Sequence, residues 1–388
     1  MSEHSTLSPS SMSRWSRCPG SVALCAGIPR SATKYSAWGS VAHIIAADCL
    51  VQKRNPGAFL GRIYVQDGFE IAVNQEMVDT VQAYAEVVRP RFAGADLVLI
   101  EEKLDLSSVY AQPDQLGTGD CIILRGHGLE IHDLKGGKGV PVSAEGNEQM
   151  LSYAAGALEA VERVVGAGTI KDIEMWIHQP RVRSEPDTFT VSRAELMVFV
   201  DAARRAARIA MQPNQPLVPG VKQCRFCSAK ATCPALGKEV LTTVADKFDN
   251  IETPKPVTSD TNALGALFAK IPLIELWCRA VIGRVEELAF AGTPVPGVKV
   301  VQGKQGNRAW GDADKVRELV ADREQMFERV LLSPPAAEKV LKKADKALWA
   351  TLCEHVVRSD GKLQVVSVDD ARPAVSVEPA ANKFEALS

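Results

Sequence analysis

The sequence predicts an α/β fold in which a mixed central sheet is flanked by helices. Strand-like runs of alternating or continuous apolar residues occupy 95–106, 120–124, 129–135 and 170–178. Amphipathic runs typical of helices lie between and around them, at 36–52, 73–90, 145–165 and 192–211. Only Gly126-His127-Gly128 separates the second and third strands, which predicts a tight turn between neighbours in the sheet.

Composition places the chain among ordinary globular proteins. It has 388 residues, 46% hydrophobic and 24% charged, enough for one large domain or two smaller ones. The net charge of −2 excludes a global basic field, so any contact with nucleic acid must come from local patches. No apolar run approaches the roughly 18 residues of a membrane helix, and the N-terminus lacks the apolar core of a signal peptide. We therefore expect a cytoplasmic protein without a membrane partner.

Changes in composition predict the domain organisation. Residues 1–245 form the first domain, and the polar, proline-containing stretch 246–262 forms a linker. Residues 263–388 form a mainly helical C-terminal region, with helices at 263–291, 312–330 and 334–357, a hairpin at 292–310 and a short strand at 363–368. Ser36 and Ser192 are the expected N-caps of the helices at 36–52 and 192–211, because serine side chains accept bonds from free helix amides.

The strand at 129–135 ends in charged residues of the kind that bind a metal cation and a phosphate. Alternation places Leu129, Ile131, Asp133 and Lys135 on one face, so an apolar face ends in a carboxylate followed by an ammonium. Asp120 opens the neighbouring strand and adds a second carboxylate. Two carboxylates beside a lysine can hold a hard cation next to a positive charge, and such a site can cut a phosphodiester.

Further ligands and positioning groups come from the rest of the chain. His43, in the first helix, supplies an imidazole nitrogen, and the backbone carbonyl of Leu134 supplies another oxygen; such a mixed shell suits Mg²⁺ or Mn²⁺. Gln149 and Tyr153 are four residues apart and share one helix face, from which they can position substrate or water. Asp-x-Lys alone is common in proteins, so the signal lies in the order of the whole set.

That order is Gly-x-x-x-His, Gly-x-x-Asp, Asp-x-Lys and Gln-x-x-x-Tyr. It resembles the PD-(D/E)XK nuclease superfamily, in particular its RecB-like branch with the CRISPR-associated RecB-like exonucleases and the AddB nuclease domain. The chain looks most like a phage- and prophage-encoded family of RecB-like proteins. The likeness spans most of the chain, through SRWSRCPGS, SAWGSVAH, GTGDCII, HDLKGGKGVPVSAEGNEQMLSYAAGALE, IHQPRV, CRFCSAKATC and VPGVKVVQGKQGNRAW.

The resemblance implies a restriction-endonuclease-like core and a metal-dependent DNA exonuclease that leaves a 5′-phosphate. The implied catalytic residues are Asp120, Asp133, Lys135, Gln149 and Tyr153, and the implied metal ligands are His43, Asp120, Asp133 and the Leu134 carbonyl. It also implies DNA-end processing in phage recombination or replication in a bacterial cytoplasm, with a phage single-strand annealing protein as a candidate partner.

The chain departs from this pattern in the first helix. Relatives often carry a glutamate shortly after the histidine, whereas here the first carboxylate is Asp48, five residues on and directed away from His43. Two other functions stay open, a non-catalytic DNA-binding or assembly factor on a nuclease scaffold and an RNA nuclease. The sequence does not fix exonuclease polarity, strand preference or oligomeric state.

Nine cysteines form a second pattern. Cys224-x₂-Cys227-x₅-Cys233 has metal-ligand spacing, and three thiolates leave a fourth position for Cys18 or, as an alternative, Cys25. The RecB-like iron–sulfur nucleases resemble this arrangement, which implies a [4Fe-4S] cluster that joins the two ends of the nuclease domain; structural Zn²⁺ is the alternative. The remaining thiols have apolar neighbours and are expected to be buried: Cys49, Cys121, Cys278 and Cys353.

Local basic residues offer phosphate contacts. We expect Arg17, Lys138 and Arg181 to bind DNA, because they flank the cysteine, the catalytic lysine and the end of a strand. An ordinary solvated surface is an equally good interpretation of each one taken singly.

Overall fold

The computed structural model describes residues 5–28, 32–139, 141–248, 261–303, 305–306, 308–323, 326, 331–357, 361, 363–367 and 372–376. The chain divides into two compact units, Met1–Trp277 and Cys278–Ser388. Their boundary falls inside helix α10 (Thr261–Phe290) and not in the stretch 246–262. Helix α9 (Pro234–Phe248) occupies the start of that stretch, and residues 249–260 lie outside the described part of the chain.

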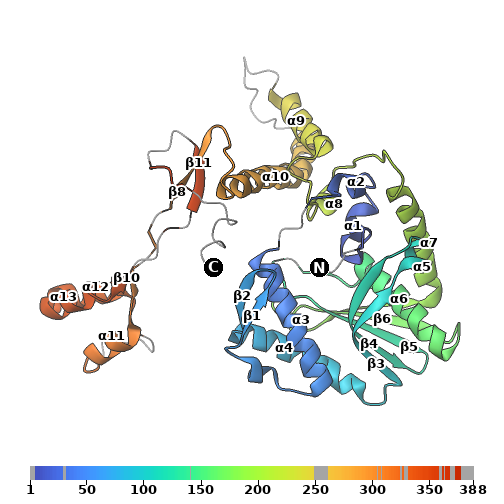
Figure 1. The fold of residues 1–388 in the computed structure, drawn as a ribbon, viewed down its shortest axis with the longest axis horizontal. Helices are drawn as coiled ribbons and strands as arrows, with labels where there is room; N and C mark the ends of the chain where they lie inside the picture. The colour runs from blue at the N-terminus through green and yellow to red at the C-terminus, as the bar shows by residue number, and fades with distance from the viewer. Residues whose placement is uncertain are drawn as a thin grey trace, which may run out of the picture. The chain divides into compact units, whose positions relative to one another are not determined.

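The first unit is built on a five-stranded mixed sheet of order β3-β4-β5-β6-β7 (Figure 1). Strands β3, β4 and β5 form an antiparallel meander, β5 and β6 are parallel, and β7 is antiparallel to β6. A parallel pair requires a crossover, which helix α6 (Glu148–Val165) provides. The strands are β3 (Leu97–Asp105), β4 (Leu116–Arg125), β5 (Gly128–Leu134), β6 (Asp172–His178) and β7 (Asp187–Ser192).

Helices cover both faces of this sheet. Helix α6 and helix α7 (Arg193–Ala210) bury Leu129 and Ile131 of β5 on one face, together with apolar residues of β4 and β6. Helix α3 (Lys34–Gln52) and helix α4 (Gln75–Val88) pack on the other face, against Cys121, Ile123 and Leu134. The strands are continuous apolar runs because both faces of the sheet are buried. The helices are amphipathic because each buries only the face that contacts the sheet.

Helix caps agree with one of the two predicted positions. Ser192 caps α7 in a capping box with Glu195, as predicted. The prediction of Ser36 as the cap of α3 is wrong, because Thr33 is the N-cap and Ser36 is the third helical residue that completes its capping box. The prediction that Asp120 opens its strand is also wrong: pairing with β3 continues β4 back to Leu116, so Asp120 lies in the middle of the strand.

Smaller elements surround this core. A hairpin of β1 (Ile63–Gln66) and β2 (Phe69–Ala72) packs against α3, and neither this hairpin nor β7 was predicted. The short helices are η1 (Pro9–Ser11), α1 (Met12–Trp15), α2 (Ser21–Cys25), η2 (Pro56–Phe59), η3 (Arg89–Phe92), α5 (Ser107–Tyr110) and α8 (Val221–Cys224). Helices α1 and α8 contact each other, which brings the two ends of the first unit together.

The second unit contains a small helical core and two strand pairs. Strand β8 (Val298–Gln302) pairs with β11 (Leu363–Ser367), and β9 (Ala309–Trp310) pairs with β10 (Val356–Val357). The predicted hairpin at 292–310 is therefore wrong, because both of its strands pair with later segments. Helix α11 (Ala313–Leu319) is shorter than predicted, and the predicted helix at 334–357 is two helices, α12 (Pro334–Ala344) and α13 (Lys346–Cys353), separated at Asp345. In the described ranges no helix has the length and apolar character needed to cross a bilayer.

Candidate functional site

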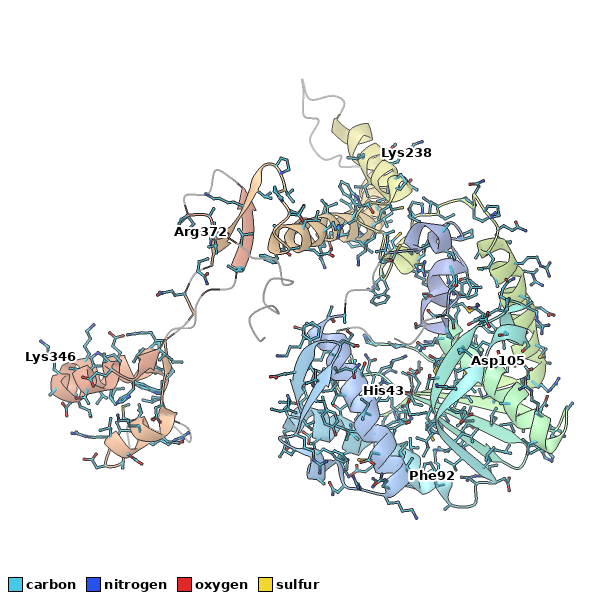
Figure 2. The ribbon with its side chains drawn as sticks, in the orientation of Figure 1. His43, Phe92, Asp105, Lys238, Lys346 and Arg372 are labelled. Atoms are coloured by element: carbon cyan, nitrogen blue, oxygen red, sulfur yellow. The ribbon has the colours of Figure 1, made fainter. Side chains whose placement is uncertain are left out.

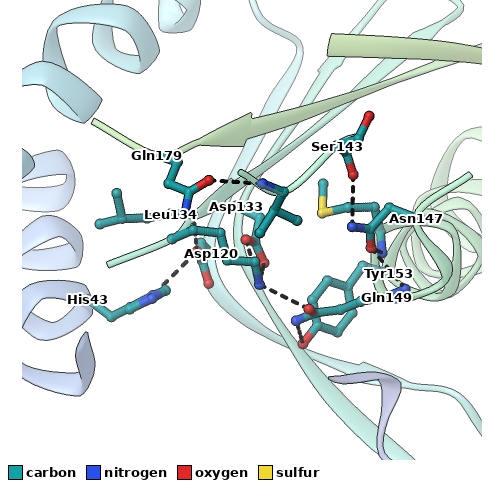
Figure 3. A network of polar contacts seen from close by, with 12 residues as sticks. His43, Asp120, Asp133, Leu134, Ser143, Asn147, Gln149, Tyr153 and Gln179 are labelled. Carbon is teal, nitrogen blue, oxygen red and sulfur yellow. Dashed lines mark hydrogen bonds and ion pairs between the residues drawn. The ribbon is translucent and has the colours of Figure 1, made fainter. Parts of the chain in front are cut away.

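A group of carboxylates lies where β4 and β5 separate. The last paired residues are Cys121 and His132, and beyond them the Asp120 Oδ2 accepts a hydrogen bond of 2.7 Å from the Leu134 amide. The Asp120 side chain thus takes the place of a strand–strand bond and holds the two strand ends apart (Figure 3). The next amide, of Lys135, bonds the His178 carbonyl on β6. Because successive backbone groups alternate in direction, the Leu134 carbonyl lies on the Asp120 side.

The lysine beside these carboxylates is fixed from two sides. Lys135 Nζ lies 2.9 Å from Asp133 Oδ2 and 3.2 Å from Oδ1, and it donates a 2.9 Å bond to Gln149 Oε1. Gln149 Nε2 in turn donates to the Tyr153 hydroxyl at 3.0 Å. The ammonium is aligned for a hydrogen bond with Oδ1 only, so Asp133 Oδ2 is buried without a hydrogen-bond donor. A buried carboxylate oxygen in this state is a ready ligand for a cation.

His43 completes the site from α3, where it lies between the helix and the sheet (Figure 2). Its Nδ1 is 3.3 Å from Asp120 Oδ2 and 3.9 Å from Glu101 Oε1. Ligand atoms of His43, Glu101 and Asp120 all lie within 4.8 Å of one another. Among the residues that the structure describes, this is the one group of three possible metal ligands with that spacing.

Sequence reasoning missed Glu101, and the reason is local. The β3–β4 register is the same on both sides of Glu101, with Ile100↔Cys121 before it and Glu102↔Gly119 after it, so Glu101 lies opposite Asp120 at a position where the pairing is interrupted. Its φ of 51° is left-handed, which is unusual for a glutamate and interrupts the extended backbone at this point without adding a residue to the strand. The Glu101 carboxylate lies 3.9 Å from His43 Nδ1. The visible signal was the pair of acidic residues that interrupts an apolar strand.

Electrostatics reflect the crowding of negative charge. Burial raises the pKa of Glu101 and the Asp120 charge raises it further, to about 7. Burial opposes charge on His43, but Asp120, Asp133 and Glu101 outweigh it and raise the pKa of His43 to about 9. Burial also raises the pKa of Asp133, against the opposing effect of Lys135. A divalent cation would relieve this repulsion, and the carboxylate-rich donor set with one imidazole suits Mg²⁺ or Mn²⁺.

The site opens into a cleft of about 1220 Å³. One wall is α3, the floor is the carboxylate group, and the loop Gly136–Gly139 and helix α6 complete the lining. Asp48, the carboxylate that follows His43 in the sequence, pairs with Arg54 at 3.1 Å and does not line the cleft.

The three basic residues predicted to bind DNA have different surroundings. Arg181 is 11% exposed; it stacks over Trp38 at 4.0 Å, donates to the Gly136 carbonyl at 2.6 Å and pairs with Glu76 at 3.1 Å, so it holds the cleft loop. Lys138 is more exposed, lines the cleft and pairs with Glu76. Arg17 makes a two-point contact with Glu148 at 2.7 and 2.8 Å, at the start of α6.

Five thiols gather where the two ends of the first unit meet. Cys25 Sγ lies 3.6 Å from Cys227 Sγ, and this contact lowers the pKa of Cys25 to about 5. Burial raises the pKa of Cys224, and the nearby thiols of Cys18 and Cys233 add to that rise. Within the described ranges no three of these sulfurs lie within 4.8 Å of one another.

The other cysteines divide by unit. Cys49 and Cys121 are buried, as predicted, in the core beneath α3 and α4. The prediction of burial is wrong for Cys278 and Cys353, which are exposed, because apolar neighbours along a helix do not decide which face a residue occupies.

A family model covers almost the whole chain. It matches residues 4–373 and is described as a protein of unknown function, DUF2800. The match includes the cleft, the thiols and the second unit as far as residue 373. The chain therefore belongs to the DUF2800 family.

Proposed function

We propose that the protein is a metal-dependent deoxyribonuclease of the PD-(D/E)XK type that digests DNA from an end. The observation that supports this best is the convergence of Asp120, Asp133 and Lys135 at the separated ends of two strands, with the buried Asp133 carboxylate paired to the Lys135 ammonium. The mixed sheet with helices on both faces is compatible with a restriction-endonuclease-like core. Membership in DUF2800 is neutral, since that family has no assigned activity.

The donor set defines where a cation would bind. Asp120, Asp133 and Glu101 carboxylates, the His43 imidazole and the Leu134 carbonyl are the candidate ligands. When bound, a divalent cation supplies charge for the phosphate oxygens and lowers the pKa of water. Lys135 carries its positive charge to the same place and is held there by Gln149, which Tyr153 orients. These residues position a phosphate and a water against the carboxylate end of the cleft.

For the thiols we propose a [4Fe-4S] cluster with Cys18, Cys224, Cys227 and Cys233 as ligands. A tetrahedral zinc with Zn–S bonds of about 2.3 Å holds its thiolates roughly 3.8 Å apart. One pair of these sulfurs, Cys25 and Cys227 at 3.6 Å, lies at about that spacing, so Cys25 stays the alternative fourth ligand and the metal content of the protein decides between the cluster and zinc. Protein purified without oxygen should be brown and contain iron and sulfide; a colourless protein with one zinc per chain would overturn this assignment.

A panel of substrates tests the activity. Purified protein with Mg²⁺ or Mn²⁺ is incubated with linear and circular DNA, single and double strands, and RNA, and products are resolved on gels. We expect metal-dependent loss of linear DNA. Asp133→Asn should abolish it, while Asp48→Asn, a matched change of a carboxylate outside the cleft, should leave it intact. Cleavage of RNA alone, or binding without cleavage by a metal-loaded protein, would instead assign one of the two alternatives.

A further inference from the structure

Helix α3 has a glycine where the protein itself gives no reason for one. Gly39 lies in the helix interior, where glycine destabilises the helix relative to alanine. A Cβ added to it would meet no atom within 4 Å, and its φ is not in the left-handed region. Gly39 faces the cleft, between Ser36 and His43 on the same wall. Packing within the described structure therefore does not require a glycine at this position, whereas a ligand that lies directly on the helix backbone would require one.

The loop on the opposite side of the cleft also contains glycines that packing does not require. Gly137 and Gly139 have no left-handed φ, and a Cβ added to either would meet no atom within 4 Å. Both line the cleft, with the exposed Lys138 between them. The loop is held from behind, since Gln179 donates to the Gly137 carbonyl at 3.1 Å. It approaches α3 closely, because a methyl group on Gly136 would stand 3.4 Å from the Gly39 Cα.

An exposed aromatic ring stands at the end of this glycine-lined passage. Tyr35 is 86% exposed and lies four residues before Gly39, so both belong to the same face of α3. At the other end is Asp133, which is 3% exposed and whose Oδ2 lies 2.9 Å from Lys135 Nζ without an aligned hydrogen bond. The passage thus joins a free aromatic surface to the carboxylate end of the cleft.

We propose that this passage is the track of one polynucleotide strand, with a base stacked on Tyr35 and the sugar–phosphate backbone passing between Gly39 and Gly137–Gly139 to reach Lys135. Aromatic side chains bind single strands by stacking on bases, and every base offers a face for it. Inside a duplex both faces of a base are already covered, so Tyr35 gains nothing from it. This inference rests on the proposed nuclease function and specifies its substrate as a single-stranded end or tail.

Binding of a labelled strand tests the track without cleavage. Anisotropy is measured on a fluorescein-labelled oligothymidylate of about 15 nucleotides, in an Asp133→Asn background. Tyr35→Ala should weaken binding about tenfold, and Tyr35→Trp should restore it, because the ring and not the hydroxyl makes the contact. Phe268→Ala is the matched control, since Phe268 is 74% exposed on α10 and does not line the cleft. An unchanged affinity in Tyr35→Ala would overturn the proposal.

The glycine gives an independent test with opposite signs. Gly39→Ala should raise the melting temperature by about 2 °C and weaken strand binding, because the methyl group favours the helix and blocks the track. Gly283 lies in α10, and a Cβ added to it would also meet no atom within 4 Å. Gly283→Ala should therefore raise the melting temperature by the same amount and leave strand binding unchanged. Equal binding in both alanine variants would exclude the track.

Cleavage assays separate this proposal from the one on which it rests. If wild-type protein cuts a 3′- or 5′-tailed duplex faster than a blunt one, and Tyr35→Ala removes the difference, both stand. If cleavage is metal-dependent but equal on blunt and tailed ends in both proteins, the nuclease stands and the track falls. If nothing is cleaved while the labelled strand binds through Tyr35, the track stands and the nuclease falls.

Discussion

The carboxylate group and the thiol group of the first unit are held in opposite ways. Asp120, Asp133, Glu101 and His43 sit on adjacent strands and on α3, over two apolar cores that keep them in place. The thiols sit on or beside short helices, and the closest pair, Cys25 and Cys227, is 202 residues apart in sequence. The folded sheet and helices therefore hold the carboxylate group in place without a ligand. A metal ligand bound to the thiol group would instead hold together two distant segments of the chain.

This contrast predicts that thiols control stability and carboxylates control activity. Cys224→Ala should lose the cluster and lower the free energy of unfolding by about 5 kcal/mol, the scale expected for a crosslink closing a long loop. Cleavage per folded molecule should persist. Denaturant unfolding and visible absorbance measure the first effect, and Cys353→Ala, an exposed thiol of the second unit, is the control. An unchanged unfolding midpoint in Cys224→Ala would remove the distinction between the two groups.

The carboxylate group should show the reverse behaviour. Asp120→Asn keeps an oxygen that can accept the Leu134 amide but removes the charge, so cleavage should fall at least about 10³-fold. The melting temperature should stay level or rise, because the charge on Asp120 crowds those of Glu101 and Asp133. Initial rates on linear DNA and thermal unfolding of the same samples measure the two effects. A large drop in melting temperature would mean that Asp120 is structural.

The same contrast explains what the sequence could predict. The sequence singled out six residues together because their order along the chain resembles the motif set of PD-(D/E)XK nucleases: His43, Asp120, Asp133, Lys135, Gln149 and Tyr153. Glu101 was missed because a single left-handed residue inside a strand has no periodic signal. The hairpin at 292–310 failed for a related reason: β8 pairs with β11, about 60 residues later, and local pattern does not encode a distant partner.

Two histidines, His178 on the sheet and His43 on α3, are expected to change the stability of the fold with pH in opposite directions. His178, whose carbonyl accepts the Lys135 amide, lies within 3.0 Å of His132, and burial together with His132 lowers its pKa to about 3. The unfolded chain therefore takes up this proton first, so His178 destabilises the fold as pH falls below about 6.5. His43, with its raised pKa, has the opposite sign.

A variant isolates the His178 contribution from that of His43. The unfolding free energy of His178→Asn minus that of wild type should become more positive by about 1.4 kcal/mol per pH unit below about pH 6.5. Denaturant unfolding between about pH 7.5 and 5.5 measures this difference. A difference independent of pH would show that His178 is not held neutral by the fold.

The smallest effect concerns Glu101, the candidate ligand whose backbone is left-handed. Asparagine adopts the left-handed conformation more readily than glutamate, so Glu101→Asn should preserve or slightly raise the unfolding free energy. It shortens the side chain and removes the charge next to His43, so cleavage should fall by roughly tenfold and recover in part at higher Mn²⁺ concentration. Glu102→Asn, one residue on and paired with Gly119, should leave cleavage unchanged. Equal rates for the two variants would mean that Glu101 serves strand geometry alone, and that the candidate ligand side chains are Asp120, Asp133 and His43.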